Sequence, residues 1–365
     1  MASPPKLSLS HHFASTLDGS KISYYTAGTG PGVIVLHGAV SYALTHTELA
    51  EVLSPFYTVH IVSRRGRGLS DGYPASVTDL NIHHEPEGKG TGNTSNNSDS
   101  EDIIRVSDRT YPRTYNLAFA TAILDCEIGD LDALIKATGA KYVIGVSSGA
   151  LILLRSLLTA TSPSPPSFLP NLKSITKAII FEPPLFTTNR STTFDLSSLA
   201  QFERETMSGD VTGAMITAMR STQMGPGWIP RWIMKILSSL GFSAQEKAEQ
   251  KRLAAGGEDR GNCTFKGLGG LLRYDFAIAE GMIGDAERWR SLGKKGGDNG
   301  QSADILLLSG GLSPPYLKQC MDLLGEEISG AKRVVIKGVG HGVLGNPHFS
   351  GEAPKAVPSL REFLG

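Results

Sequence analysis

The sequence has few cysteines and no excess of charge of either sign. Cys126, Cys263 and Cys320 are the only cysteines among 365 residues, and they are odd in number and widely spaced. This pattern fits neither a disulfide framework nor a zinc site, so reduced, structural thiols are expected. Lys and Arg total 35, as do Asp and Glu, and the formal net charge is therefore zero. Since no long-range field favours nucleic acid or an anionic membrane, we expect small neutral partners.

Long apolar runs and targeting segments are also missing. No stretch approaches the roughly 18 apolar residues that a membrane span requires. Residues 1–15 lack the charged and then apolar segments of a signal peptide. We therefore predict a cytoplasmic protein without a membrane span. Nothing indicates a metal or another cofactor, and the oligomeric state is left open.

The composition is that of an ordinary globular protein with a large core. Hydrophobic residues make up 40% of the chain and charged residues 19%. At this length, the composition suits one large α/β domain with insertions, or two domains.

Strand and helix patterns alternate along the chain. Residues 12–26 predict a hairpin around Asp18-Gly19, a common turn pair. Apolar runs of the kind that is buried on both faces of a parallel sheet occur at 33–36, 57–62, 142–144, 178–181, 305–308 and 333–336. Leu124, Ile128 and Leu131 recur at helical spacing before the third of these runs. This order predicts a mainly parallel sheet with helices on both faces.

Two long segments interrupt the alternation. Residues 81–108 are poor in apolar residues and rich in Gly, Asn, Ser and charge, which predicts a mobile surface loop. Residues 186–289 read as helical and lie between two sheet strands, so we expect a lid over the carboxyl ends of the strands. The predicted core domain then comprises 1–185 and 290–365.

The predicted lid is rich in Met and Trp. Its Trp228 and Trp232 are candidates for lining an apolar substrate pocket. Alternatively, these side chains only hold the lid together.

The sequence GVSSG at 145–149 predicts a nucleophile elbow, a sharp turn from a strand into a helix. Such a turn holds one residue, here Ser147, in a strained conformation with its hydroxyl projecting outward. Gly145 and Gly149 make room for the turn because they have no side chain. In a chain with 42 glycines, the same residues could also be a glycine-capped strand end with an ordinary serine.

A serine hydroxyl is a poor nucleophile at neutral pH and needs a base beside it. His341 follows the last apolar run and is flanked by Gly340 and Gly342, so it could approach the elbow closely. His348 is the distant alternative. Four other histidines lie in segments that look exposed: His11, His12, His83 and His84.

His37-Gly38-Ala39 directly follows the run at 33–36. A glycine after a strand lets the backbone turn so that the Ala39 amide, together with that of Ser148, could bind a developing oxyanion. We expect His37 to brace this loop rather than to take part in the chemistry.

Together, these motifs resemble the α/β-hydrolase fold superfamily. The residues that carry the resemblance are HG at 37–38, SRRGRGLSDG at 63–72, GVSSG at 145–149, FEPP at 181–184, SGGLSPPYL at 309–317 and GHG at 340–342. They occur in the family's order across nearly the whole chain. The resemblance implies a mainly parallel eight-stranded sheet, Ser147 as nucleophile, His341 as base, and Ala39 and Ser148 as oxyanion donors.

The third member of a catalytic triad is less obvious. The family usually places this acid after the strand that is 305–308 here, but the residues that follow, 309–315, contain no carboxylate. Asp322 is the next one and is expected to be too far away. Glu182, fixed by two prolines after the preceding strand, is the predicted acid, although it could instead bind loop amides. Asp275 is a weaker candidate that could contact substrate or hold the lid down.

These residues predict a serine hydrolase that acts through an acyl-enzyme. The apolar lid and the lack of net charge favour an ester or lactone with an apolar body. A serine at the elbow argues against epoxide hydrolases and haloalkane dehalogenases, which use a carboxylate there. Hydrolysis of C–C bonds, cofactor-free perhydrolysis, and a catalytically degenerate ligand-binding member of the fold remain open alternatives.

Overall fold

The computed structural model describes residues 7–81, 103–106, 109–112, 117–186, 198–225, 227–293 and 303–365. Within these residues, one sheet has eight strands in the order β1-β2-β4-β3-β7-β8-β9-β10. They are β1 (Ser10–Ser15), β2 (Lys21–Ala27), β3 (Gly32–Leu36), β4 (Thr58–Val62), β7 (Tyr142–Val146), β8 (Lys177–Phe181), β9 (Asp304–Gly310) and β10 (Lys332–Ile336). The β1–β2 and β2–β4 pairs are antiparallel, and the others are parallel. The predicted fold class is thus confirmed.

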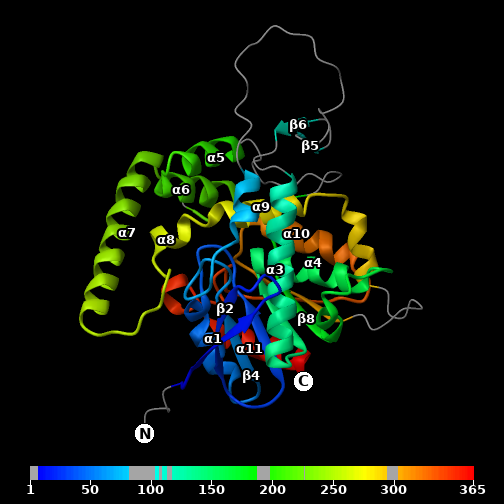
Figure 1. The fold of residues 1–365 in the computed structure, drawn as a ribbon. Helices are drawn as coiled ribbons and strands as arrows, with labels where there is room; N and C mark the ends of the chain where they lie inside the picture. Colours follow the sequence, from blue (N-terminus) through cyan, green and yellow to red (C-terminus); the bar gives the residue numbers. More distant parts are fainter. Residues whose placement is uncertain are drawn as a thin grey trace.

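The central strands are apolar on both faces because helices cover both. Ile34 and Leu36 of β3 belong to one core cluster, while Val33 and Val35 belong to another. This alternation follows from the two-residue period of a strand. The first cluster lies under α3 (Leu117–Thr138), α4 (Ser148–Thr161) and α10 (Pro315–Glu327), and the second under α1 (Thr47–Leu53) and α11 (Ala353–Leu364) (Figure 1).

Helices make up most of the described chain between β8 and β9. They are α5 (Leu199–Met207), α6 (Val211–Ser221), α7 (Arg231–Ala254), α8 (Phe265–Gly269), α9 (Leu272–Gly281) and the 3₁₀ segment η5 (Ala286–Leu292). Figure 1 shows α7 at the outer edge of the molecule, whereas α9 runs beside α3. Met234 is the single buried residue of α7. The helical content agrees with the sequence, and the division into core and lid stays a prediction.

The loop expected at 81–108 lies mostly outside the described residues. Residues 103–106 of this segment are described: they form strand β5 (Ile103–Val106), which pairs antiparallel with β6 (Arg109–Pro112).

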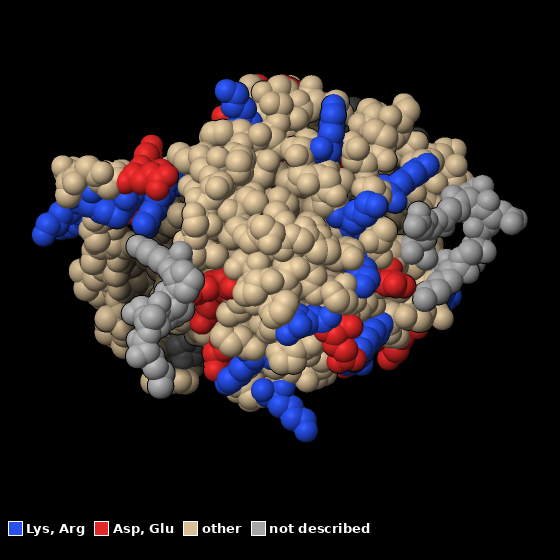
Figure 2. Space-filling model, turned by 90° about the horizontal axis from the view of Figure 1, so that it is seen from below, with Lys and Arg blue, Asp and Glu red and all other residues tan. Residues whose placement is uncertain are grey.

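The surface has no strong field of one sign on the face seen from below. Lys and Arg are interspersed there with Asp and Glu around a wide uncharged area (Figure 2). Among the described helices, none has the length and apolar character needed to cross a bilayer.

Candidate active site

Ser147 lies at the sharp turn that joins β7 to α4. Its φ of 54° and ψ of −119° fall outside the regions that non-glycine residues usually adopt. The turn is held in place because the Ser147 N–H donates to the Phe181 carbonyl oxygen at 2.8 Å. A Cβ on Gly145 would lie 2.7 Å from the Ala150 Cα, and one on Gly149 would lie 2.4 Å from the Leu36 carbonyl oxygen. Neither position has space for a side chain, as the elbow pattern requires.

This packing predicts opposite effects for two helical glycines. Gly149→Ala should lower the free energy of unfolding by about 1–3 kcal/mol, because the new methyl group meets backbone oxygens of Leu36 and His37. Gly129→Ala, on α3, should raise it by about 0.5–1 kcal/mol, since nothing lies within 4 Å of the added Cβ. Urea denaturation of both variants measures the difference, and equal midpoints would contradict the close packing.

Glu182 lies directly after β8 and is completely buried. Its backbone has a positive φ of 45°, which is uncommon for a residue other than glycine. Oε1 accepts a hydrogen bond from the Gly310 N–H at 2.7 Å, and Oε2 lies 2.6 Å from Nδ1 of His341. The carboxylate thus reaches the carboxyl end of β9, where the sequence itself supplies no acid.

His341 lies in the loop after β10, with its side chain 18% exposed. Its ring stacks on Phe181, with centroids 5.8 Å apart. Since Glu182 accepts from Nδ1–H, Nε2 carries no proton in the neutral ring and can act as a base. The Phe181 carbonyl oxygen also accepts from the Ser147 amide, so His341 and Ser147 both contact Phe181. No hydrogen bond joins Ser147 Oγ to His341 among the described contacts, and such bonds are often long before substrate binds.

The loop after β3 passes directly beside the serine. A Cβ on Gly38 would lie 2.8 Å from the Ser147 Cβ. Val40 adopts a φ of 52°, unusual for a β-branched residue. The next amide after Gly38, that of Ala39, therefore lies close to the elbow. Ser148 is the first residue of α4, where unpaired N–H groups favour negative charge.

The remaining candidate residues lie elsewhere. Asp275 on α9 is buried and accepts hydrogen bonds from Ser148 Oγ at 2.7 Å and from Arg64 Nη1 at 2.8 Å. It therefore lies behind Ser148 and not beside His341. Trp228 and Trp232 are 84% and 65% exposed, so the structure does not bring their rings into a closed pocket around Ser147.

Sequence reasoning missed a group of buried charges around Asp275. Arg64 donates two hydrogen bonds to Glu127 on α3, at 3.0 and 2.7 Å, and Arg67 Nη2 lies 2.5 Å from Asp275 Oδ2. The signal was present in SRRGRG, because buried arginines require carboxylate partners. The partners themselves are distant in sequence.

Electrostatics around the site fix several protonation states. Burial, and then Arg64 and Arg67, hold the pKa of His37 well below its usual value, so its ring is neutral. Burial alone would raise the pKa of Asp275, but the charges of Arg67 and Arg64 outweigh this effect and hold the pKa below its usual value. Asp275 is thus an anion at neutral pH.

The thiols are poor competitors for the role of nucleophile. Burial raises the pKa of Cys126 and of Cys320 to about 12 each, and that of Cys263 to about 11. All three are protonated at neutral pH, and the thiolate is the reactive form.

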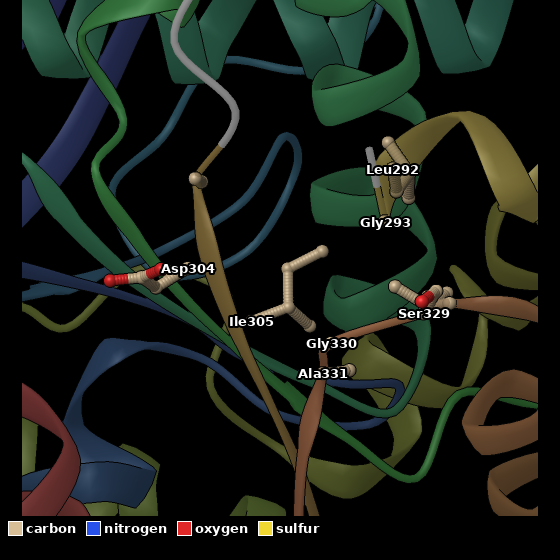
Figure 3. Close-up of a pocket in the computed structure, with 9 residues that line it drawn as sticks. Leu292, Gly293, Asp304, Ile305, Ser329, Gly330 and Ala331 are labelled. Atoms are coloured by element: carbon tan, nitrogen blue, oxygen red, sulfur yellow. The ribbon is translucent and has the colours of Figure 1, made fainter. Parts of the chain in front are cut away.

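A small depression lies at the amino ends of the strands, at the end of the sheet opposite to the candidate site. It is bordered by residues before or at the amino ends of β9 and β10, among them Ile305, Ser329 and Ala331 (Figure 3). Its volume of about 10 Å³ is enough for one water molecule. Ser147, Glu182 and His341 follow the carboxyl ends of their strands, so this depression is remote from them. Within the described ranges, no group of His, Cys, Asp and Glu could hold a metal ion.

The site thus combines an elbow serine, a paired histidine and two amides at the carboxyl edge of a mainly parallel sheet, as serine hydrolases of the α/β type do. Residues 33–357 match the model of the alpha/beta hydrolase family. The chain belongs to this family, which supports hydrolase activity.

Solved structures agree on the fold. An α/β hydrolase from Sphaerobacter thermophilus is 22% identical with a TM-score of 0.59, covering 97% of this chain and 100% of the other. An esterase from Exiguobacterium antarcticum is 17% identical with a TM-score of 0.54, covering 96% and 98%. An esterase from a Rhodococcus species is 15% identical with a TM-score of 0.52, covering 97% and 99%. At these identities the likeness shows the fold alone. No curated protein matches the chain in sequence.

Proposed function

We propose that the chain is a serine hydrolase that cleaves an ester or lactone of a small apolar substrate. Ser147 is the nucleophile, His341 the base and Glu182 the acid. The observation that carries the proposal is the contact of 2.6 Å between Glu182 Oε2 and His341 Nδ1, made by a fully buried carboxylate beside a strained elbow serine.

In the first half of the reaction, His341 Nε2 takes the proton of Ser147 as Oγ attacks the carbonyl carbon. The Glu182 carboxylate stabilises the imidazolium that forms and holds the ring by Nδ1. His341 then gives the proton to the leaving alcohol, and an acyl-enzyme results. Water, activated by the same histidine, hydrolyses the acyl-enzyme and restores Ser147.

The Ala39 and Ser148 amides serve as the oxyanion hole in both halves. They donate to the oxygen that becomes negative in the tetrahedral intermediate. Pre-oriented donors of this kind are worth about 3–4 kcal/mol each in the transition state. No metal or cofactor has a role in this mechanism.

Support for an ester or lactone substrate is indirect. Esterases are among the proteins that share the fold. The inserted helices are rich in apolar side chains, and the chain carries no net charge that would recruit an ionic substrate. We also propose a cytoplasmic location, in keeping with three unpaired cysteines.

A pre-steady-state experiment tests the proposal. With p-nitrophenyl esters of graded chain length, the purified protein should release a burst of p-nitrophenol equal to the enzyme concentration, followed by slower turnover. A fluorophosphonate probe should label Ser147, located by peptide mapping. A protein that is labelled but cleaves only C–C bonds, and no ester or lactone, would redirect the substrate class. A protein that is neither labelled nor active would be the degenerate, ligand-binding alternative.

A further inference from the structure

Behind the proposed oxyanion hole lie four buried charges, called here the arginine cluster: Arg64, Arg67, Glu127 and Asp275. Their side chains are between 0% and 4% exposed. Two positive and two negative groups balance, so the cluster adds no net charge to the site. Buried groups of this kind stabilise little compared with apolar packing, but the hydrogen bonds between them restrict their geometry. Arg67 Nε is buried without a hydrogen-bond partner among the described residues, so the restriction is strongest at Arg64.

Arg64 holds the side chain of Ser148. Its Nη1 donates to Ser148 Oγ at 3.1 Å and to Asp275 Oδ1 at 2.8 Å, and Ser148 Oγ donates to the same Asp275 oxygen at 2.7 Å. Glu127 fixes the other edge of the guanidinium through two bonds. The Ser148 side chain is therefore locked by a donor and an acceptor, and the backbone amide of the same residue is the second oxyanion donor.

The main chain of Arg64 holds the other half of the hole. Its N–H donates to His37 Nε2 at 3.0 Å, and His37 Nδ1–H donates to the Gly38 carbonyl oxygen at 2.7 Å. This carbonyl and the Ala39 N–H belong to one planar trans peptide and point in opposite directions. A hydrogen bond that draws the carbonyl toward His37 therefore turns the Ala39 N–H away from it.

We propose that Arg64 is a positioning residue that orients both oxyanion amides, Ser148 through its guanidinium and Ala39 through His37. The inference rests on the proposed function and deepens it. Arg64, which follows β4, thereby couples the loop after β3 to the first turn of α4. The oxyanion hole is held as a single unit.

The cluster also ties this unit to the inserted helices. Asp275 lies on α9, and its second oxygen accepts from Arg67 at 2.5 Å. Glu127 belongs to α3, along which α9 packs. Asp275 therefore links α9 to the Ser148 side chain as well as to Arg64 and Arg67.

Ser148→Ala tests the guanidinium arm, because it removes the hydroxyl and keeps the amide. We expect kcat to fall about 10- to 100-fold with KM changed less than about threefold, since an oxyanion donor acts mainly in the transition state. The affinity for a trifluoromethyl ketone analogue should fall by the same factor as kcat/KM. The matched control is Tyr73→Phe, which removes a hydroxyl bound to Glu127 at the far side of the cluster and should leave kcat unchanged.

A double-mutant cycle separates positioning from general loss of packing. Arg64→Lys keeps the positive charge and the main-chain hydrogen bond to His37, but it loses the several N–H donors of the planar guanidinium. If Arg64 acts through Ser148, the double variant Arg64→Lys with Ser148→Ala should lose no more kcat than the worse single variant. Additive losses, or a Ser148→Ala enzyme with wild-type kcat, would overturn the inference.

Amide chemical shifts give a readout that needs no turnover. In labelled protein, the Ser148 amide resonance should move in Arg64→Lys and stay in place in Tyr73→Phe. If the wild type hydrolyses neither an ester nor a lactone, the proposed function fails, and the amide shifts still decide whether Arg64 orients the Ser148 amide. Unmoved resonances in a folded Arg64→Lys protein would rule the positioning out. If Arg64→Lys does not fold, the Ala39 amide resonance is measured in Ser148→Ala instead. A shift of this resonance would support the coupling between the two oxyanion amides, and an unchanged resonance would refute it.

Discussion

Ser147→Ala is expected to lower kcat on an activated ester by about 10⁵–10⁶-fold and to abolish labelling by a fluorophosphonate. Without Oγ, no acyl-enzyme can form, and His341 has no hydroxyl to deprotonate. Residual turnover would come from water attacking a carbonyl that the Ala39 and Ser148 amides polarise. Steady-state kinetics and in-gel labelling measure both effects.

A neighbouring serine provides the control for this substitution. Ser156 is buried on α4, and its hydroxyl donates to the Ile152 carbonyl oxygen at 2.9 Å. Ser156→Ala should keep wild-type kcat and labelling, because its hydroxyl serves the helix alone. Full turnover in Ser147→Ala would show that the elbow serine is not the nucleophile.

The backbone at Ser147 explains why little loss of stability is expected. A non-glycine residue at a φ of 54° carries about 1–3 kcal/mol of strain, and alanine would carry the same strain. The elbow is maintained by the close approach of Gly149 to the end of β3 and by the bond to Phe181. Neither depends on the serine hydroxyl. Loss of activity can therefore be separated from loss of the fold.

The elbow and the sheet could be predicted from sequence because their signals are local. Buried parallel strands appear as short apolar runs, and a strand-to-helix turn needs glycines at fixed places. Glu182 is predicted partly because no carboxylate follows β9, and partly because the family resemblance offers the end of the preceding strand as another place for the acid. Its contact with the Gly310 amide, 128 residues later, comes from the strand order.

The arginine cluster could not be predicted in the same way. Arg64 meets Glu127 and Asp275 across 63 and 211 residues, and any of many carboxylates could have been its partner. The exposure of Trp228 and Trp232 likewise depends on how the inserted helices pack, which has no local signal. Sequence patterns therefore indicate the proposed reacting groups, whereas tertiary packing decides what surrounds them.

Glu182→Gln should lower kcat about 10³–10⁴-fold while the protein stays folded. The glutamine oxygen can still accept from the Gly310 N–H, so its NH₂ group then faces His341. An amide N–H at that place cannot accept a hydrogen bond from Nδ1–H, and it favours the tautomer that carries its hydrogen on Nε2. His341 would present a donor to Ser147, and the base would be lost.

Asp322→Asn is the matched control for this loss. Asp322 is the first carboxylate after β9 in sequence, but it is half-exposed and pairs with Arg333. Its substitution should leave kcat unchanged if Glu182 is the acid. The reverse outcome, a tenfold or smaller loss in Glu182→Gln with a large loss in Asp322→Asn, would move the acid to α10 and leave Glu182 as a bridge between strand ends. Because both variants remove one charge and keep the side-chain shape, the comparison depends on what each carboxylate contacts.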